Sequence, residues 1–284
     1  GWPTSRGTAE RGPPPRGAAG AHLMIGLLKV LYRYRALISS LVSRELKARY
    51  RGSVLGFLWS FINPLLLLLT YTLVFTMILR VPQTERMSPY YLFFFCGLLP
   101  WTWFSSSLLE SASVLIAGGN LIKKVLFPAE VLPTVTVLAN LANFLLGMPI
   151  LLAFLAWEGR LSVTLLLLPI PIFVQLVLTL GCALFLSALT VHFRDMGNIL
   201  AHILQLWFFA TPILYDVEIL EGAVRQAMRL NPMGHIIISY QQMLLFGHFD
   251  HWRGLAGALV AGFLALAVGA FIFDRLRDTL SEGV

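Results

Sequence analysis

Residues 163–190 have the sequence VTLLLLPIPIFVQLVLTLGCALFLSALT, and this stretch decides the class of protein because it carries no charged residue. An α-helix needs about 20 predominantly apolar residues to cross the roughly 30 Å hydrocarbon core of a bilayer. Other apolar stretches lie before and after it, the one at 199–215 being short: residues 54–79, 90–109, 131–157, 199–215 and about 255–273. We therefore predict an all-α integral membrane protein with six transmembrane helices.

The composition of the chain supports this class. Of its 284 residues, 57% are hydrophobic and 12% are charged. Soluble domains carry about 25% charged and 45–50% apolar residues, so an ordinary cytosolic domain is excluded. Cys96 and Cys182 lie inside apolar runs, where a thiol behaves as a small hydrophobic group. They indicate neither a disulfide framework nor a metal site.

The distribution of basic residues predicts the orientation in the membrane. A formal net charge of +7 fits either a nucleic-acid-binding protein or a membrane protein that follows the positive-inside rule. With six spans and a cytosolic N-terminus, 15 of the 21 lysines and arginines fall on the cytosolic side, and the others are Arg80, Arg86, Arg160, Arg225, Arg229 and Arg253. This asymmetry predicts that both termini are cytosolic, and it explains the charge without a nucleic-acid partner.

The segment between the fifth and sixth spans, at about residues 216–253, is unusual. Its apolar patch IIISYQQMLLFG, residues 236–247, is too short to span a bilayer and carries Gln241 and Gln242. A seventh span here would move the basic C-terminal tail to the outside, against the positive-inside rule. We therefore expect short re-entrant gate helices in this segment.

The chain before the first span divides into two parts. Residues 1–23 are rich in Gly, Pro, Ala and Arg without apolar periodicity, which predicts a disordered leader that is not necessarily native, with Met24 as a plausible start. Residues 24–53 predict an amphipathic interface helix, whose apolar face comprises Leu27, Leu31, Tyr34, Ile38, Leu41 and Val42 and whose basic face comprises Lys29, Arg33, Arg44, Lys47 and Arg51.

Some residues of this region do not fit the amphipathic pattern. Arg35 and Arg49 lie off the basic face and could contact lipid headgroups or a partner protein. Anchoring the chain to the membrane and contacting a cytosolic partner are both open roles for the helix. Gly52 and Gly56 have a spacing that favours close helix packing at the start of the first span. The six-span transmembrane domain then occupies residues 54–284.

Sequence motifs for catalysis are missing. The chain contains no HExxH, GxSxG or CxxC, and without a Gly-Lys pair it has no phosphate-binding loop of the GxxxxGK[ST] type. The carboxylate within the predicted spans is Glu110, for which an interfacial and a functional role are both open. His248 and His251 flank Asp250, but no third metal ligand is evident. We predict no catalytic residue, no metal and no nucleotide site in this chain.

Several motifs resemble one family of membrane proteins. They are RELKARYRGSVLGFLWSFINPLLLLLTYTLVF (44–75), GLLPWTWF (97–104), NLIKKVLFPAEVLP (120–133), VHFRDMGNIL (191–200) with QLWFFATPILY (205–215), and Asn231-Pro232. In this order they resemble the membrane subunit of polysaccharide-exporting ABC transporters of the type-2 exporter class, which serve O-antigen, teichoic-acid and capsule systems. The resemblance covers roughly residues 25–284.

The resemblance implies an assembly. It implies a homodimer of six-span subunits in the cytoplasmic (inner) membrane of a bacterium, with membrane lipids around it and two copies of a separate ATPase subunit that binds ATP and Mg. A connector at about residues 118–130 would be the coupling helix. The implied ATPase-coupling residues are Asn120, Lys123, Lys124, Phe127 and Pro128 in the connector, and Arg44, Glu45, Lys47 and Arg49 in the interface helix. For Lys123 and Lys124, a positive-inside signal explains the charge equally well.

Aromatic residues near the span ends suggest a path for substrate. In general such residues form interfacial belts, yet aromatic faces also offer weak contacts to sugar C–H groups that permit sliding. The residues that we predict for a glycan channel are Phe94, Trp101, Trp103, Phe104, Trp207, Phe208, Phe209 and Tyr215. Arg194 and Asp195 predict a structural helix junction, and Asn231 and Pro232 belong to the outer gate segment.

The expected function is the transmembrane subunit of an ATP-driven exporter of a lipid-linked polysaccharide. The alternative within the same architecture is a type-2 ABC exporter of a drug or small lipid. A membrane enzyme acting on polyprenyl-linked sugars is a rival from another class, against which the missing acid–base groups argue. A structural scaffold would not need gate-like broken segments.

Overall fold

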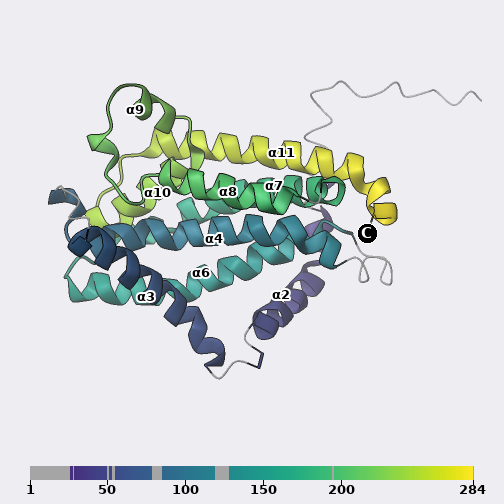
Figure 1. Cartoon of the computed structure of the whole chain (residues 1–284), viewed down its shortest axis with the longest axis horizontal. Coiled ribbons are helices and arrows are strands. Elements are labelled where there is room, and N and C mark those ends of the chain that lie inside the picture. The colour runs from purple at the N-terminus through teal and green to yellow at the C-terminus, as the bar shows by residue number, and fades with distance from the viewer. Residues whose placement is uncertain are drawn as a thin grey trace, which may run out of the picture.

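The computed structural model describes residues 26–27, 29–49, 51–52, 55–78, 85–118, 128–193 and 195–283. All regular elements in these ranges are helices. Figure 1 shows the long helices side by side in a bundle, with α9 and α10 at one end and the C-terminus at the other. The helices that are long and apolar enough to cross a membrane occupy Tyr90–Ala117, Val131–Trp157, Val163–His192 and Trp252–Leu276. These four helices coincide with the second, third, fourth and sixth predicted spans.

Helices also form at the first and fifth predicted spans, but they are shorter. Helix α3 (Trp59–Thr72, 14 residues) contains Pro64 and continues as a π-helical turn over Leu73–Ile78. Helix α8 (Met196–Phe209) also has 14 residues. A straight 14-residue α-helix rises about 21 Å, less than the hydrocarbon thickness. The structure therefore supports the predicted helix order and gives four helices of full membrane-spanning length among the residues it describes.

The four long helices form the body of the bundle. They are α4 (Tyr90–Ala117), α6 (Val131–Trp157), α7 (Pro169–His192), which follows the 3-10 turn Val163–Leu167, and α11 (Trp252–Gly283). Helix α4 is the most enclosed, with 78% of its most apolar window buried inside the chain. Its buried side chains include Phe93, Phe94 and Phe95, which supply large apolar surfaces to the core. Helix α4 is therefore the central element, with α6 and α7 packed against it, whereas α11 packs mainly against α7.

Helices α7 and α11 meet through glycines. A Cβ atom added at Gly181 would lie 2.3 Å from the Leu266 nitrogen, and one added at Gly269 would lie 2.3 Å from the Gly181 oxygen. Small residues permit such close approach of two backbones in membrane helices. At Gly52 and Gly56, where the sequence suggested close packing, nothing lies within 4 Å of an added Cβ. That expectation was wrong, and both residues instead have positive φ angles.

The N-terminal helix α2 (Arg35–Arg49) packs against the end of the bundle. Ile38 is buried among α6 residues such as Val131, Leu132 and Val135. The other members of the predicted apolar face contact the same cluster, and those that are described are Leu27, Leu31, Tyr34, Leu41 and Val42. The apolar face of the predicted interface helix is thus covered by the protein itself.

The predicted gate segment consists of short helices. They are the 3-10 turn Val217–Ile219, α9 (Gly222–Met228), α10 (Pro232–Gln241) and a π-helical turn over Gln242–Phe246. Gly247 ends this run in the left-handed conformation, with φ 69°. In Figure 1 these helices lie at the end of the bundle opposite α2 and the C-terminus. The segment therefore forms one end of the bundle.

Candidate functional site

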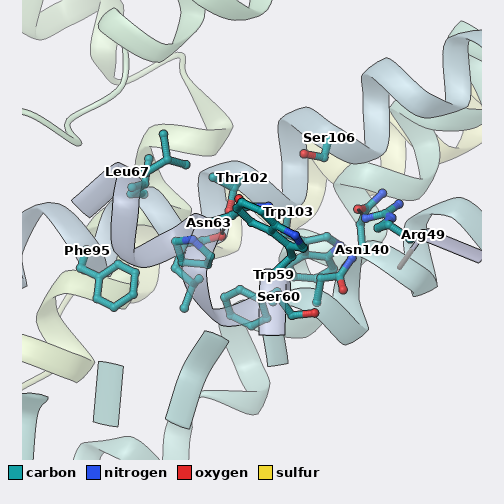
Figure 2. A pocket seen from close by; sticks show the side chains of 15 residues that line it. Arg49, Trp59, Ser60, Asn63, Leu67, Phe95, Thr102, Trp103, Ser106 and Asn140 are labelled. Carbon is teal, nitrogen blue, oxygen red and sulfur yellow. Dashed lines mark hydrogen bonds between the residues drawn. The ribbon is translucent and has the colours of Figure 1, made fainter. Parts of the chain in front are cut away.

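A cavity of about 370 Å³ lies between α3, α4 and α6, and we call it the α3 cavity. In Figure 2 Arg49 and Asn140 lie at one end and Phe95 at the other, with Asn63, Thr102 and Trp103 between them. Its polar wall consists of Arg49, Ser60, Asn63, Thr102, Ser106, Asn140 and Asn143, and its apolar part includes Leu67, Phe95, Leu98, Leu99 and Phe144. Polar side chains at membrane depth are costly and mark functional sites by default.

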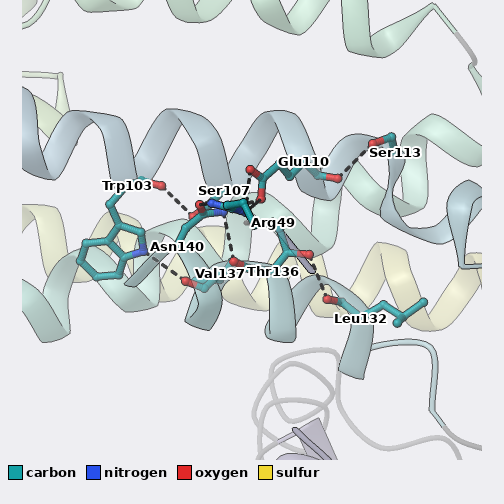
Figure 3. Close-up of polar contacts among 9 residues, drawn as sticks. All are labelled: Arg49, Trp103, Ser107, Glu110, Ser113, Leu132, Thr136, Val137 and Asn140. Carbon is teal, nitrogen blue, oxygen red and sulfur yellow. Dashed lines mark hydrogen bonds and ion pairs between the residues drawn. The ribbon is translucent and has the colours of Figure 1, made fainter. Parts of the chain in front are cut away.

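The polar end of the cavity adjoins a closed ring of hydrogen bonds, which we call the Arg49 cluster (Arg49, Glu110 and Asn140). Arg49 donates from Nη2 to both carboxylate oxygens of Glu110, at 2.9 and 2.8 Å, and from Nη1 to Asn140 Oδ1 at 3.0 Å. Asn140 Nδ2 donates to Glu110 Oε2 at 2.7 Å and to the Thr136 carbonyl at 3.2 Å. Figure 3 shows the three side chains meeting from α2, α4 and α6.

The Arg49 cluster neutralises its own charges. The side chains of Arg49 and Glu110 are 26% and 41% exposed, whereas Asn140 is only 3% exposed. Glu110, for which an interfacial and a functional role were both open, forms an ion pair with Arg49. Two residues pointed to this site in the sequence. Arg49 lies outside the basic face of the predicted interface helix, and Glu110 is a carboxylate within a predicted span. Neither indicated Asn140, which completes the ring.

The predicted ATPase-coupling residues are only partly described. Asn120, Lys123, Lys124 and Phe127 lie outside the described residues, and Pro128 is half-buried just before α6. On α2, Arg44, Glu45 and Lys47 are exposed, while Arg49 is engaged in the Arg49 cluster. Arg194 also lies outside the described residues, and Asp195 is exposed at the start of α8. The exposed face of α2 thus leaves charged side chains available at the end of the bundle.

Asn231 joins α8 to the gate segment through its whole amide group. Its Oδ1 accepts from Trp207 Nε1 at 2.9 Å and from the Gly234 nitrogen at 3.1 Å, so it also caps α10. Its Nδ2 donates to the Ala210 carbonyl and to Thr211 Oγ1, each at 3.1 Å. Pro232 follows as the first residue of α10, where its missing N–H costs no hydrogen bond.

Two histidines form a second link at the same end. His235 Nε2 lies 2.9 Å from the Arg229 carbonyl, which can only accept, so this nitrogen carries the proton. His235 Nδ1 then accepts from His251 Nε2 at 2.8 Å. Burial lowers the pKa of His251 below its ordinary value of 6.5, His235 lowers it further, and Asp250 opposes the shift. The link therefore joins α10 to the residue that precedes α11.

The aromatic residues predicted for a glycan channel form two groups. Five of them are buried inside the chain, namely Phe94, Trp101, Trp103, Phe104 and Phe208. Ring contacts join α4 to α8, with centroids 5.2 Å apart for Phe104 and Trp207 and 5.7 Å apart for Trp101 and Phe208. Trp207 and Tyr215 are half-buried and Phe209 is 54% exposed. These three line a separate hollow of about 370 Å³ beside α9 and Asn231.

Comparison with known proteins finds one matching family and several related export proteins. Residues 36–245 match the family model described as ABC-2 type transporter. The chain is 40% identical over 264 residues to the O-antigen export system permease protein RfbA of Myxococcus xanthus, covering 92% of this chain and 100% of that protein. It is 33% identical to an RfbA of Klebsiella pneumoniae, covering 90% and 98%. It is 22% identical to the polysialic acid transport protein KpsM of Escherichia coli, covering 87% and 95%.

Proposed function

The chain belongs to the ABC-2 type transporter family, and from this premise we propose that it is the membrane permease subunit of an ATP-driven exporter of a lipid-linked polysaccharide. The observation that carries the proposal is the 40% identity to an O-antigen export permease, which extends over the whole of that protein. The relatives named for O-antigen or polysialic acid favour a glycan over a drug or small lipid as the substrate.

The energy for export comes from a partner. The sequence contains no phosphate-binding loop, so we infer that a separate ATPase subunit binds ATP and Mg. The exposed charges of α2 support this, because Arg44, Glu45 and Lys47 can form ion pairs with a cytosolic partner. The connector residues Asn120, Lys123, Lys124, Phe127 and Pro128 would bind the same subunit. We also propose that two copies of the chain assemble in the transporter with two ATPase subunits.

We propose the inner membrane of a bacterium as the location, with several passes and both termini cytosolic. The excess of basic residues at the predicted cytosolic side supports this orientation. Helix α2 and the C-terminus lie at the same end of the bundle, as two cytosolic termini require (Figure 1). The gate segment would then face outward and adjoin the hollow lined by Trp207, Phe209 and Tyr215, where a passing glycan could contact aromatic surfaces.

Co-purification from the native membrane tests the proposal. We expect a nucleotide-binding subunit in stoichiometric amount, and an ATPase activity of the complex that changes when lipid-linked polysaccharide is added. Reconstituted into vesicles, the complex should move that substrate only when ATP is supplied. Recovery of the chain alone under mild conditions, or an ATPase that responds to small amphiphiles and not to glycan, would contradict the proposal.

The double substitution Lys123→Glu and Lys124→Glu tests the connector. If these lysines bind acidic groups of the ATPase, reversing both charges should uncouple ATP hydrolysis from export while the chain stays folded in the membrane. A positive-inside signal alone predicts a different result, since it would alter insertion and leave a correctly inserted complex fully coupled. The matched control is Arg275→Glu, which reverses one charge at the same predicted face outside the connector.

A further inference from the structure

The α3 cavity contains a hydroxyl group that has no partner. Ser60 is 7% exposed, and its Oγ makes no hydrogen bond. Several other buried hydroxyls bond to a carbonyl of the preceding turn, as Thr179 does to Gln175 at 2.7 Å and Ser107 to Trp103 at 2.7 Å. Ser111 and Tyr240 lack a partner as Ser60 does, but they do not line the α3 cavity. A buried polar group that lacks a partner is destabilising and calls for an explanation. A ligand that supplies the missing hydrogen bond is such an explanation.

The charge of the wall does not favour an anion as the natural ligand. Among the described residues that line the α3 cavity, Arg49 is the charged one, and it is already paired with Glu110 at 2.8 Å. Recognition of phosphate or carboxylate groups relies on charge-assisted bonds from a free arginine or lysine. The remaining polar groups are hydroxyls and side-chain amides, which donate to and accept from uncharged hydroxyl groups equally well.

Aromatic and apolar groups complete the wall. The indole rings of Trp59 and Trp103 and the phenyl ring of Phe144 lie beside the hydroxyl and amide groups of α3, α4 and α6. Sugar rings combine hydroxyl edges with C–H faces, so a wall of this mixed kind matches both. The volume of about 370 Å³ is at the lower end of the range for small-molecule pockets. It suits one or two sugar rings and not a long chain.

We propose that the α3 cavity binds an uncharged glycosyl unit of the exported polysaccharide, with Ser60 and Thr102 as hydrogen-bonding residues. Ser60 can donate and accept, whereas Thr102 Oγ1 already donates to the Leu99 carbonyl at 2.8 Å and would accept from a sugar hydroxyl. The inference rests on the proposed function and adds a site within one subunit to it. The cavity shares Asn140 with the Arg49 cluster, so an occupant that bonds to Asn140 acts on the residue that holds α2. Occupancy of the cavity is thereby linked to the helix that faces the ATPase.

Binding of defined sugars to the full chain in lipid nanodiscs tests the proposal without the ATPase. The probes are methyl α-D-mannopyranoside, methyl α-D-glucopyranoside and methyl N-acetyl-β-D-glucosaminide, titrated by saturation-transfer NMR, with inorganic pyrophosphate as the anionic probe. We expect at least one glycoside to bind. The variants Ser60→Ala and Thr102→Val should each weaken its binding roughly fivefold, the effect of losing about one hydrogen bond.

Two controls separate recognition from folding. Ser60→Ala removes an unpaired hydroxyl, so it should weaken sugar binding while leaving the melting temperature unchanged or raised. Ser107→Ala removes a buried hydroxyl of α4 that bonds to its own helix and does not line the cavity, so it should leave sugar binding unchanged.

Three results would overturn the proposal. They are the absence of glycoside binding, binding that Ser60→Ala and Thr102→Val leave unaltered, and binding of pyrophosphate that these variants abolish. ATP-dependent glycan export by the wild-type complex, measured separately, distinguishes the failure of this site from failure of the proposed function. Export with no sugar bound in the cavity would refute the site alone.

Discussion

Replacing Arg49 by Met tests whether the Arg49 cluster holds α2 against the bundle. Methionine keeps an apolar stem of similar length and removes the guanidinium group. Asn140 Oδ1, in a residue that is 3% exposed, then loses the 3.0 Å bond from Arg49. Leaving a buried acceptor without a donor costs about 1–3 kcal/mol. The exposed fraction of Glu110, 41%, lets water replace its lost bonds, so the ion pair itself adds only about 0.2–1 kcal/mol.

We therefore expect Arg49→Met to lower the free energy of unfolding by about 2 kcal/mol. The assay is a double-mutant cycle with Glu110→Gln, read from detergent-induced unfolding of the purified chain. The coupling energy between the two positions should be about 1 kcal/mol, within the range measured for polar pairs in membrane helix bundles. In the complex with the ATPase, Arg49→Met should also reduce stimulation of ATP hydrolysis by substrate, because α2 would then be held by its apolar contacts alone.

The matched control lies on the same helix. The Arg35 guanidinium is 4.3 Å from the ring centre of Tyr32 and donates to the Tyr32 carbonyl, both contacts being local and exposed. Arg35→Met should therefore cost about 0.5 kcal/mol. If the double variant loses the sum of the two single losses in unfolding free energy to within about 0.3 kcal/mol, Arg49 and Glu110 are independent and the predicted coupling is refuted. Equal costs for Arg49→Met and Arg35→Met would refute it as well.

Further predictions concern the helix contacts and the outer junction. Gly181→Leu should lower the melting temperature strongly, by a cost of about 3 kcal/mol or more, whereas Gly257→Leu on α11, with nothing within 4 Å, should be nearly neutral by the same thermal assay. Asn231→Ala should lower the free energy of unfolding by at least about 1 kcal/mol from the lost helix cap alone. Asn231→Asp keeps an oxygen that can accept from Trp207 Nε1 and the Gly234 nitrogen, so unfolding measurements should show that part of this stability is kept. Because the pKa of His251 is lowered in the folded state, its contribution to stability is complete above pH 6.5 and is lost as the pH falls below that value; an unfolding series from pH 8 to 5 should show this loss, and His251→Gln should flatten it.

The sequence predicted the long helices well because their signal is local. Four of the six predicted spans coincide with helices that are long and apolar enough to cross a membrane. In the first span, hydropathy does not report the 14-residue length of α3, its internal Pro64 or the π-helical turn that follows. Hydropathy reports how strongly the side chains prefer an apolar environment to water. It does not report where the backbone changes from α-helical to π-helical hydrogen bonding.

Contacts between distant parts of the chain were harder to predict. The spacing of Gly52 and Gly56 suggested close packing, yet the close approach occurs at Gly181 and Gly269, because a glycine pattern does not say which helices meet. Arg49 and Glu110 were each noticed as unusual, but only the fold brings them together. Asn231 was predicted as part of the gate segment, and its bond to Trp207 depends on where α8 ends.

The glycine contact between α7 and α11 constrains how the subunit can change shape. Where the backbones touch at Gly181 and Gly269, no side chain lies between the two helices that could change rotamer. We therefore expect α7 and α11 to move together as one unit when the subunit changes shape, with the change taken up at their contacts with other helices.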